Sequence, residues 1–119
     1  MSIISLNKCL NTKSPIGDNM GHFYPNAKFK TITNYEGGNC IAWCIEKEGI
    51  IYMANVWVHP ESRGKGRGMK MMEEIRNHFS KHQIISDYNE TSQGFWKKVF
   101  EAGHIDEVVD DNFKFEWVY

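Results

Sequence analysis

The sequence predicts an α/β (α+β) fold with a mixed, mainly antiparallel central sheet flanked by helices. Three stretches rich in β-branched and aromatic residues follow one another between residues 27 and 58, and two amphipathic helical stretches come after them. Strands that precede and separate helices favour one sheet with the helices packed on it. Because 119 residues can enclose one hydrophobic core, we expect a single domain over residues 1–119.

Turn residues separate the three strand-like stretches. We expect antiparallel strands over residues 29–35, 39–48 and 50–58. Between them lie Glu36-Gly37-Gly38 and Lys47-Glu48-Gly49, where glycine suits the tight turns of hairpins. Residues 1–25 contain only short apolar stretches around turn residues, so the secondary structure of this segment is poorly specified. We expect a brief element followed by a loop. The sheet therefore begins with a meander.

Two helices and two further strands are expected after the meander. Apolar residues recur at helical spacing at Met69, Met72, Ile75 and Phe79. Residues 83–88 indicate a short buried strand, and residues 91–102 indicate a second helix that ends at Gly103. Alternating apolar residues over 112–119 predict a closing strand.

Composition limits the partners and the location of the protein. The net charge of −1 lacks the basic excess of chains dominated by nucleic-acid contacts, so nucleic acid is not expected as a partner. No segment approaches the ~20 apolar residues that cross a bilayer, so no membrane contact is expected. Cys9, Cys40 and Cys44 form no C-x-x-C pair and no signal peptide is evident, which predicts a cytoplasmic protein. The histidines and cysteines lack metal-ligand spacing, so no metal is expected.

A glycine-rich basic loop joins the meander to the first helix. It comprises Arg63, Gly64, Lys65, Gly66, Arg67 and Gly68. Backbone N–H groups at a helix N-terminus attract anions, glycine lets a ligand approach the backbone, and the cations neutralise the ligand's charge. The loop therefore predicts a phosphate site, with a solvated basic turn and an RNA-binding RGG-like segment as alternatives. It is no P-loop, because no Gly-Lys pair precedes Ser or Thr, and its third glycine comes one residue early for a dinucleotide fingerprint.

Residues 58–68 resemble the acyl-CoA-binding signature V-x-P-x-x-R-G-x-G-x-G of GNAT acetyltransferases. The narrower family pattern Q/R-x-x-G-x-G/A is met by Arg63, Gly66 and Gly68. Downstream, the family pattern N-x-x-A/S-x-x-F/L-Y is resembled by Asn89, Ser92, Phe95 and Trp96. The resemblance covers roughly residues 49–103 and implies a GNAT-like acyl-CoA N-acyltransferase fold with acetyl-CoA as co-substrate.

The resemblance also implies which residues contact acetyl-CoA. The strand before the loop would separate from its neighbour near Val56, Trp57 and Val58, and a backbone N–H there would stabilise the oxyanion of acyl transfer. The residues that the resemblance assigns to the co-substrate are Val56, Trp57, Val58, Arg63, Gly64, Lys65, Gly66, Arg67, Gly68, Met69, Asn89, Ser92 and Trp96.

The catalytic candidates are Asp87, Tyr52 and Tyr88. Family members often place a glutamate base on the fourth strand, but this region has Tyr52, and the nearest acidic residue is Asp87 at the end of the next strand. A purely structural, half-buried Tyr52 is the alternative. Trp96 stands where the family usually has a tyrosine acid, and an indole N–H cannot act as a general acid. We therefore expect Trp96 to pack against the pantetheine, and Tyr88 or solvent to protonate the thiolate.

These features predict an acetyl-CoA-dependent N-acetyltransferase that works by direct attack in a ternary complex. The acceptor amine belongs to a small molecule, a protein lysine or N-terminus, or a nucleobase, and the sequence leaves it and the oligomeric state open. A non-catalytic acyl-CoA-binding module is the alternative, favoured by Trp96 and by the missing glutamate. A nucleic-acid-binding domain that uses the basic loop is a further alternative.

Overall fold

A mixed sheet forms the centre of the protein. The computed structural model describes residues 2–6, 29–34, 40–88 and 90–110. Within them, six strands lie side by side in chain order: β1 (Ser2–Leu6), β2 (Phe29–Asn34), β3 (Cys40–Lys47), β4 (Ile50–Val58), β5 (Gln83–Tyr88) and β6 (Glu107–Asp110). Strands β1 to β4 pair antiparallel, whereas β5 is parallel to β4 and to β6. The predicted mixed, mainly antiparallel sheet is confirmed.

The hairpin between β3 and β4 has the turn that its sequence predicts. Glu48 and Gly49 both have positive φ, 52° and 83°. Lys47 pairs with Ile50 on either side of them, so the connection is a two-residue loop. Positive φ at both central residues is typical of the turn type whose twist matches that of antiparallel strands. The other predicted turn, Glu36-Gly37-Gly38, lies outside the described residues.

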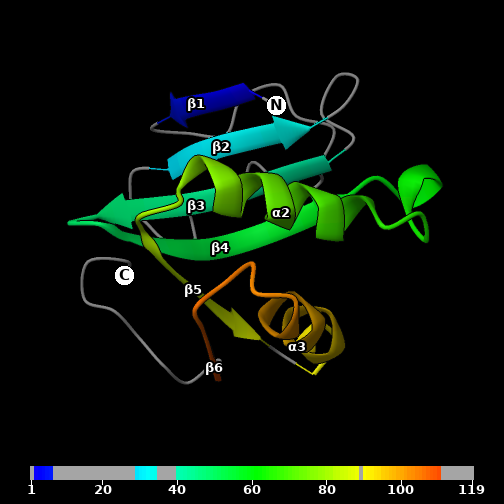
Figure 1. Cartoon of the computed structure of the whole chain (residues 1–119). Coiled ribbons are helices and arrows are strands. Elements are labelled where there is room, and N and C mark those ends of the chain that lie inside the picture. The colour runs from blue at the N-terminus through cyan, green and yellow to red at the C-terminus, as the bar shows by residue number, and fades with distance from the viewer. Residues whose placement is uncertain (1, 7–28, 35–39, 89, 111–119) are drawn as a thin grey trace.

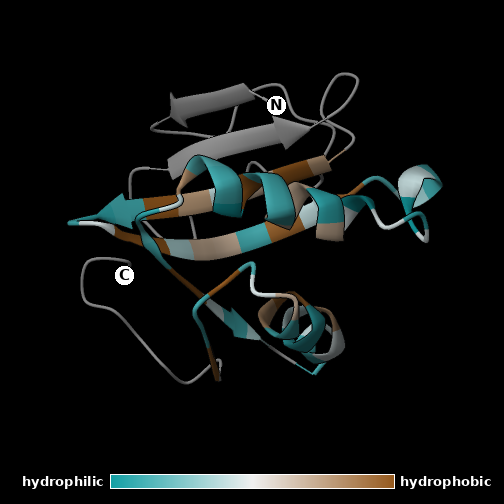
Figure 2. Cartoon of the chain, viewed as in Figure 1, coloured by the Kyte–Doolittle hydropathy of each residue, from teal (hydrophilic) through white to brown (hydrophobic). Residues whose placement is uncertain are grey.

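Among the described residues, two helices cover one face of the sheet (Figure 1). Helix α2 (Arg67–His78) connects β4 to β5, and helix α3 (Gln93–Glu101) connects β5 to β6. Each helix therefore joins two parallel strands, which need such a long connection. Figure 2 shows hydrophilic residues along the outward side of α2. A short 3-10 helix, η2 (Pro60–Ser62), precedes α2.

The main core lies between the helices and the sheet. It consists of Cys40, Ala42, Cys44, Ile51, Met53, Met71, Met72, Ile75, Phe79, Ile84, Trp96, Val99 and Ile105. Alternate residues of the same strands point to the opposite face, and these are buried as well: Ile41, Trp43, Ile45, Tyr52 and Ile85. Because both faces of β3 and of the first half of β4 are buried, the two strands have nearly continuous apolar sequences.

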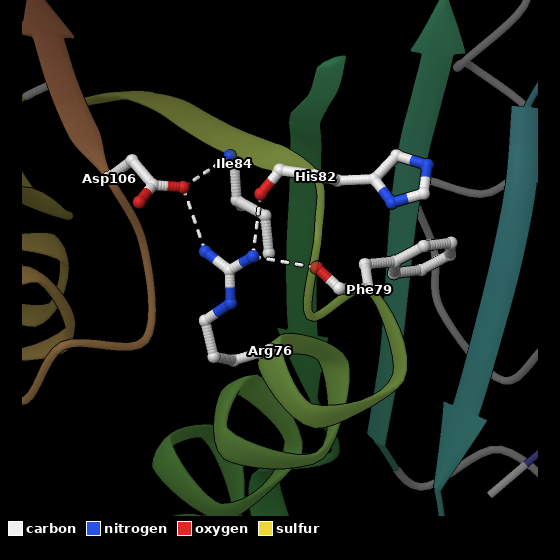
Figure 3. Close-up of polar contacts among 5 residues, drawn as sticks. All are labelled: Arg76, Phe79, His82, Ile84 and Asp106. Carbon is white, nitrogen blue, oxygen red and sulfur yellow. Dashed lines mark hydrogen bonds and ion pairs between the residues drawn. The ribbon is translucent and has the colours of Figure 1, made fainter. Parts of the chain in front are cut away.

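A polar network ties the C-terminal end of α2 to β5 and to the segment before β6 (Figure 3). Arg76 donates to the Asp106 carboxylate at 2.7 Å and to the carbonyls of Phe79 and His82 at 2.6 Å each. The same carboxylate accepts the Ile84 N–H at 2.8 Å. Burial opposes the charge of Asp106, but the hydrogen bonds from Ile84 and Arg76 and the charge of Arg76 outweigh it and lower the pKa of this carboxyl.

The structure corrects the sequence interpretation at three places. Helix α3 begins at Gln93, two residues later than predicted, although it ends before Gly103 as expected. Met71, which was not singled out, is fully buried on α2, whereas Met69 is only half-buried. Strand β6 was not predicted, because four residues at a sheet edge give little periodicity. The predicted closing strand over 112–119 lies outside the described residues.

Candidate functional site

Strands β4 and β5 separate partway along their length. Their parallel pairing runs from Ile50 opposite Gln83 to Met53 opposite Ser86 and then stops. Beyond that point β4 continues beside β3, and β5 continues beside β6. The separation begins at Ala54, earlier than the predicted region of Val56 to Val58. Beyond this point the backbone N–H and C=O groups of β4 and β5 no longer pair with each other. A ligand can therefore bind between the two strands.

A β-bulge marks the start of the separation. Cys44 faces Met53 and Trp43 faces Asn55, so Ala54 is an extra residue in β4. Such a bulge bends its strand and increases the local twist, which turns β4 away from β5. Because of the extra residue, the side chains of β4 that face the helices are at odd-numbered positions before the bulge and at even-numbered positions after it. Val56 and Val58 pack against the main core, so Asn55 and Trp57 belong to the opposite face.

A cavity of about 840 Å³ occupies the space between the separated strands. It is bounded by β4, by the loop after it, by the end of β5 and by the start of α3. Its lining residues are Met53, Ala54, Asn55, Val56, Trp57, Val58, Arg63, Gly68, Asp87, Tyr88, Thr91, Ser92, Phe95 and Trp96. A volume of this order accommodates a substantial part of a cofactor-sized molecule.

One end of the cavity lies at the glycine-rich loop. Arg63 Nε donates to the carbonyl of Val58 at 2.8 Å, which fastens the loop to the end of β4. Gly66 is the N-cap of α2 and has the left-handed conformation, with φ 70° and ψ 15°. An added Cβ at Gly66 would meet no atom within 4 Å, so the space in front of this helix N-terminus is open. A twelve-residue helix directs the positive end of its dipole into that space, which suits an anion such as phosphate.

Gly68 has a different reason to be glycine. A Cβ at this position would lie 3.2 Å from Cε1 of Phe95 and 3.6 Å from Cγ2 of Val58. The absent side chain thus lets α2, β4 and α3 approach closely. The Phe95 ring also packs edge-on against Trp96, with ring centroids 4.9 Å apart. Gly68 therefore has a packing role that connects the two sequence motifs through Phe95, and it also lines the cavity.

Asp87 and Tyr88 line the other end of the cavity, and Tyr52 lies behind Asp87. The Tyr52 hydroxyl donates a hydrogen bond to the Asp87 carboxylate. Tyr52 is 1% exposed and does not line the cavity, whereas Asp87 is half-buried and does. Tyr88, next along β5, points to the helix-covered face and packs against the main core. Asp87 and Tyr88 therefore flank the cavity from opposite faces of the sheet.

Comparison with known protein families relates this geometry to a reaction class. A family model described as an acetyltransferase (GNAT) domain matches residues 27–99, more than half of the chain. This chain belongs to the GNAT acetyltransferase family. A comparison with curated proteins finds no match. The match spans β2 to most of α3, so it includes the separated strands, the glycine-rich loop and Asp87.

The cavity brings together many of the residues that the GNAT signature predicts. Those that line it are Val56, Trp57, Val58, Arg63, Gly68, Ser92, Trp96, Asp87 and Tyr88. Residues of the loop and of the first turn of α2 that do not line it are Gly64, Lys65, Gly66, Arg67 and Met69. Asn89 lies outside the described residues. Trp96 is 5% exposed, which fits a wall of the cavity that also belongs to the core.

The charge of Arg67 acts on Cys40, the first residue of β3. Burial raises the pKa of the Cys40 thiol, and the nearby charge of Arg67 only partly offsets that effect. Cys40 is fully buried, so its thiol stays neutral and acts as a small apolar side chain.

Four cavity residues were not among the predicted site residues: Met53, Ala54, Asn55 and Thr91. Met53 and Ala54 are ordinary strand residues by sequence, and they reach the cavity because strand pairing ends and a bulge begins at their positions. Register of this kind depends on the partner strands, so no local signal could have identified them. Phe95 was quoted as part of the GNAT motif, but its contact with Gly68 required the fold.

No metal centre is apparent in the part of the chain that the structure describes, since no three His, Cys, Asp or Glu side chains gather there. Within the same residues, no helix has both the length and the apolar character to cross a membrane.

Proposed function

We propose that this GNAT protein transfers an acetyl group from acetyl-CoA to the nitrogen of an amine by direct attack in a ternary complex. The observation that carries the proposal is the cavity between β4 and β5, which extends from Arg63 and Gly68, beside the open N-terminus of α2, to Asp87 and Tyr88. An anion site and a proton acceptor thus lie at two ends of one cavity. Acyl transfer from a phosphorylated donor needs both.

The phosphate end is assigned to the loop. The pyrophosphate of acetyl-CoA would meet backbone N–H groups at the start of α2, in the space that an added Cβ at Gly66 would enter. Arg63, already directed by its hydrogen bond to Val58, and the exposed Lys65 supply positive charge. The donor's arm would then extend along Val56, Trp57 and Val58.

The proton-transfer end is assigned to Asp87. A neutral amine attacks the thioester carbonyl carbon, a C–N bond forms, and the carbonyl oxygen takes the negative charge. A backbone N–H of the separated part of β4 is the proposed donor to that oxygen. Asp87, directly or through water, accepts the proton that the nitrogen loses. Tyr52 holds the Asp87 carboxylate by a hydrogen bond and is therefore a positioning residue.

The leaving group completes the reaction. The C–S bond breaks, and the thiolate of CoA takes a proton from Tyr88 or from solvent. Tyr88 and Asp87 are adjacent in β5 and lie on opposite faces, so the acid and the base would not compete for one position. A thiol has a pKa of about 8.5 in water, so its thiolate leaves tolerably well even with weak acid assistance.

The experiment has a binding step and a turnover step. At a hundredfold excess over its dissociation constant, acetyl-CoA should stabilise the fold by about 2.7 kcal/mol, and inorganic pyrophosphate should compete. Release of free CoA thiol is then measured with spermidine, a lysine-containing peptide and a peptide with a free N-terminus. Asp87→Asn should lower turnover about 10²-fold or more without weakening acetyl-CoA binding.

A matched control and two contrary outcomes make the experiment decisive. Asp106→Asn alters a different hydrogen-bonded carboxylate, remote from the cavity lining, and should leave turnover unchanged. No thermal response to millimolar acetyl-CoA or CoA would refute the proposal altogether. Binding without transfer to any amine would instead support a non-catalytic acyl-CoA-binding module, which Trp96 in place of the family tyrosine favours.

A further inference from the structure

One end of the cavity lies where β4 and β5 begin to separate. The loop is fastened to β4 at Val58, and pairing of β4 with β5 resumes at Met53. Five residues of strand separate these points, about 17 Å at roughly 3.3 Å per residue. A donor whose phosphates lie at the loop therefore extends its acyl group toward Met53. This rests on the function proposed above.

Three walls surround that end of the cavity. Below it, Met53 and Ser86 form the last pair of the parallel ladder, and hydrogen-bonded strands let no chain pass between them. The Ser86 side chain is fully buried, and its hydroxyl donates to the carbonyl of Asp87 at 2.9 Å. On the face away from the helices lies Asp87, whose carboxylate accepts a hydrogen bond from Tyr52, and this polar group disfavours an apolar chain.

The remaining wall, on the helix-covered face, is Met53. Its side chain is 1% exposed and packs in the main core, and it also lines the cavity. A close-packed interior has no spare volume behind such a side chain. An acyl chain longer than acetyl that extends toward the helix-covered face would have to displace Met53, because the ladder blocks the path between the strands and the carboxylate disfavours an apolar chain on the opposite face.

We infer that Met53 determines the acyl length and restricts the donor to acetyl-CoA. Its Cγ, Sδ and Cε occupy the volume that the outer carbons of a butyryl group would need. Met53 would then select the donor by excluding longer acyl groups, since one methylene more than the available apolar space costs about tenfold or more in affinity or rate. The role of Met53 is one of specificity, with no part in proton transfer.

The test compares the affinities of CoA, acetyl-CoA and butyryl-CoA, measured by isothermal titration. The parent should bind acetyl-CoA at least tenfold more tightly than butyryl-CoA. Met53→Ala should reduce this preference at least tenfold by strengthening butyryl-CoA binding, with CoA affinity unchanged. Met72→Ala is the matched control, because Met72 is equally buried in the same core but does not line the cavity, and it should keep the parent's preference.

The outcomes separate this inference from the function on which it rests. A parent that binds none of the three compounds would refute the proposed function. A parent that binds CoA and acetyl-CoA, with a Met53→Ala variant that keeps the parent's preference, would overturn the acyl-length inference alone. Should Met53→Ala fail to fold, Met53→Val removes less volume and suits a strand. It should admit propionyl-CoA at least fivefold better than the parent, and an unchanged propionyl-CoA affinity would equally overturn the inference.

Discussion

The substitution Gly66→Ala separates the backbone role of the glycine-rich loop from its proposed ligand role. Gly66 has φ 70° and ψ 15°, a left-handed conformation that costs a residue with a side chain about 1–2 kcal/mol. No steric clash adds to this, because an added Cβ would meet no atom within 4 Å. For a domain of this size, 1 kcal/mol shifts the melting temperature by roughly 3–6 °C. We therefore expect Gly66→Ala to melt about 3–12 °C below the parent.

The effect on acetyl-CoA should be larger than the effect on stability. The added methyl group would occupy the space that we assign to the pyrophosphate, so the affinity should fall at least tenfold, a loss of about 1.4 kcal/mol or more. Isothermal titration with acetyl-CoA, at a temperature where the variant is fully folded, measures this directly. Thermal denaturation without ligand measures the backbone cost separately.

Gly103→Ala is the matched control. Gly103 also has positive φ, 81°, also has open space around it, and follows α3 away from the cavity lining. Its substitution should cost a similar amount of stability and leave acetyl-CoA affinity unchanged. If Gly66→Ala binds acetyl-CoA as tightly as Gly103→Ala does, the start of α2 does not hold the pyrophosphate and the reasoning fails.

Two further predictions concern the cavity wall and the network in Figure 3. Trp96→Ala should lose about 3–5 kcal/mol of stability, because Trp96 is 5% exposed, and should bind acetyl-CoA more weakly, whereas Trp96→Phe should bind it within about threefold of the parent. Unweakened binding by folded Trp96→Ala would remove Trp96 from the site. The folded pKa of Asp106 lies below its ordinary value of 3.8, so its contribution is complete above that pH and is lost as pH falls through the folded pKa. Because the Asp106 side chain is 47% exposed, Asp106→Asn should lower the free energy of unfolding by only about 1 kcal/mol at pH 7. Urea titrations should find that the difference in unfolding free energy between parent and variant shrinks below pH 3.8, and a pH-independent difference would contradict this.

The meander and the first helix could be predicted because their signals are local. Strands β2, β3 and β4 are rich in β-branched and aromatic residues, and Gly49 supplies the positive φ that the turn between β3 and β4 requires. Helix α2 has apolar residues at helical spacing after a run of glycines. Each of these patterns depends only on neighbours a few residues away, which is the range over which propensity and periodicity act.

The glycine-rich loop was recognisable for the same reason, but the roles of its glycines were not. By sequence, Gly66 and Gly68 are equivalent members of one motif. In the fold, Gly66 needs a left-handed backbone and faces open space, whereas Gly68 needs room for the Phe95 ring from α3. The difference arises from a contact between residues 27 positions apart, which no local pattern encodes.

What the sequence determined by itself was therefore the fold class, the likeness to GNAT acetyltransferases and the position of the glycine-rich loop. Only the tertiary structure decided where β4 leaves β5, that Tyr52 donates to Asp87, and that Met53 lines the cavity. These features depend on strand register and on a bulge at Ala54, both of which are set by pairing with partner strands. Shifting such pairing by one residue would move every side chain to the other face, so the site exists only once the whole sheet has formed.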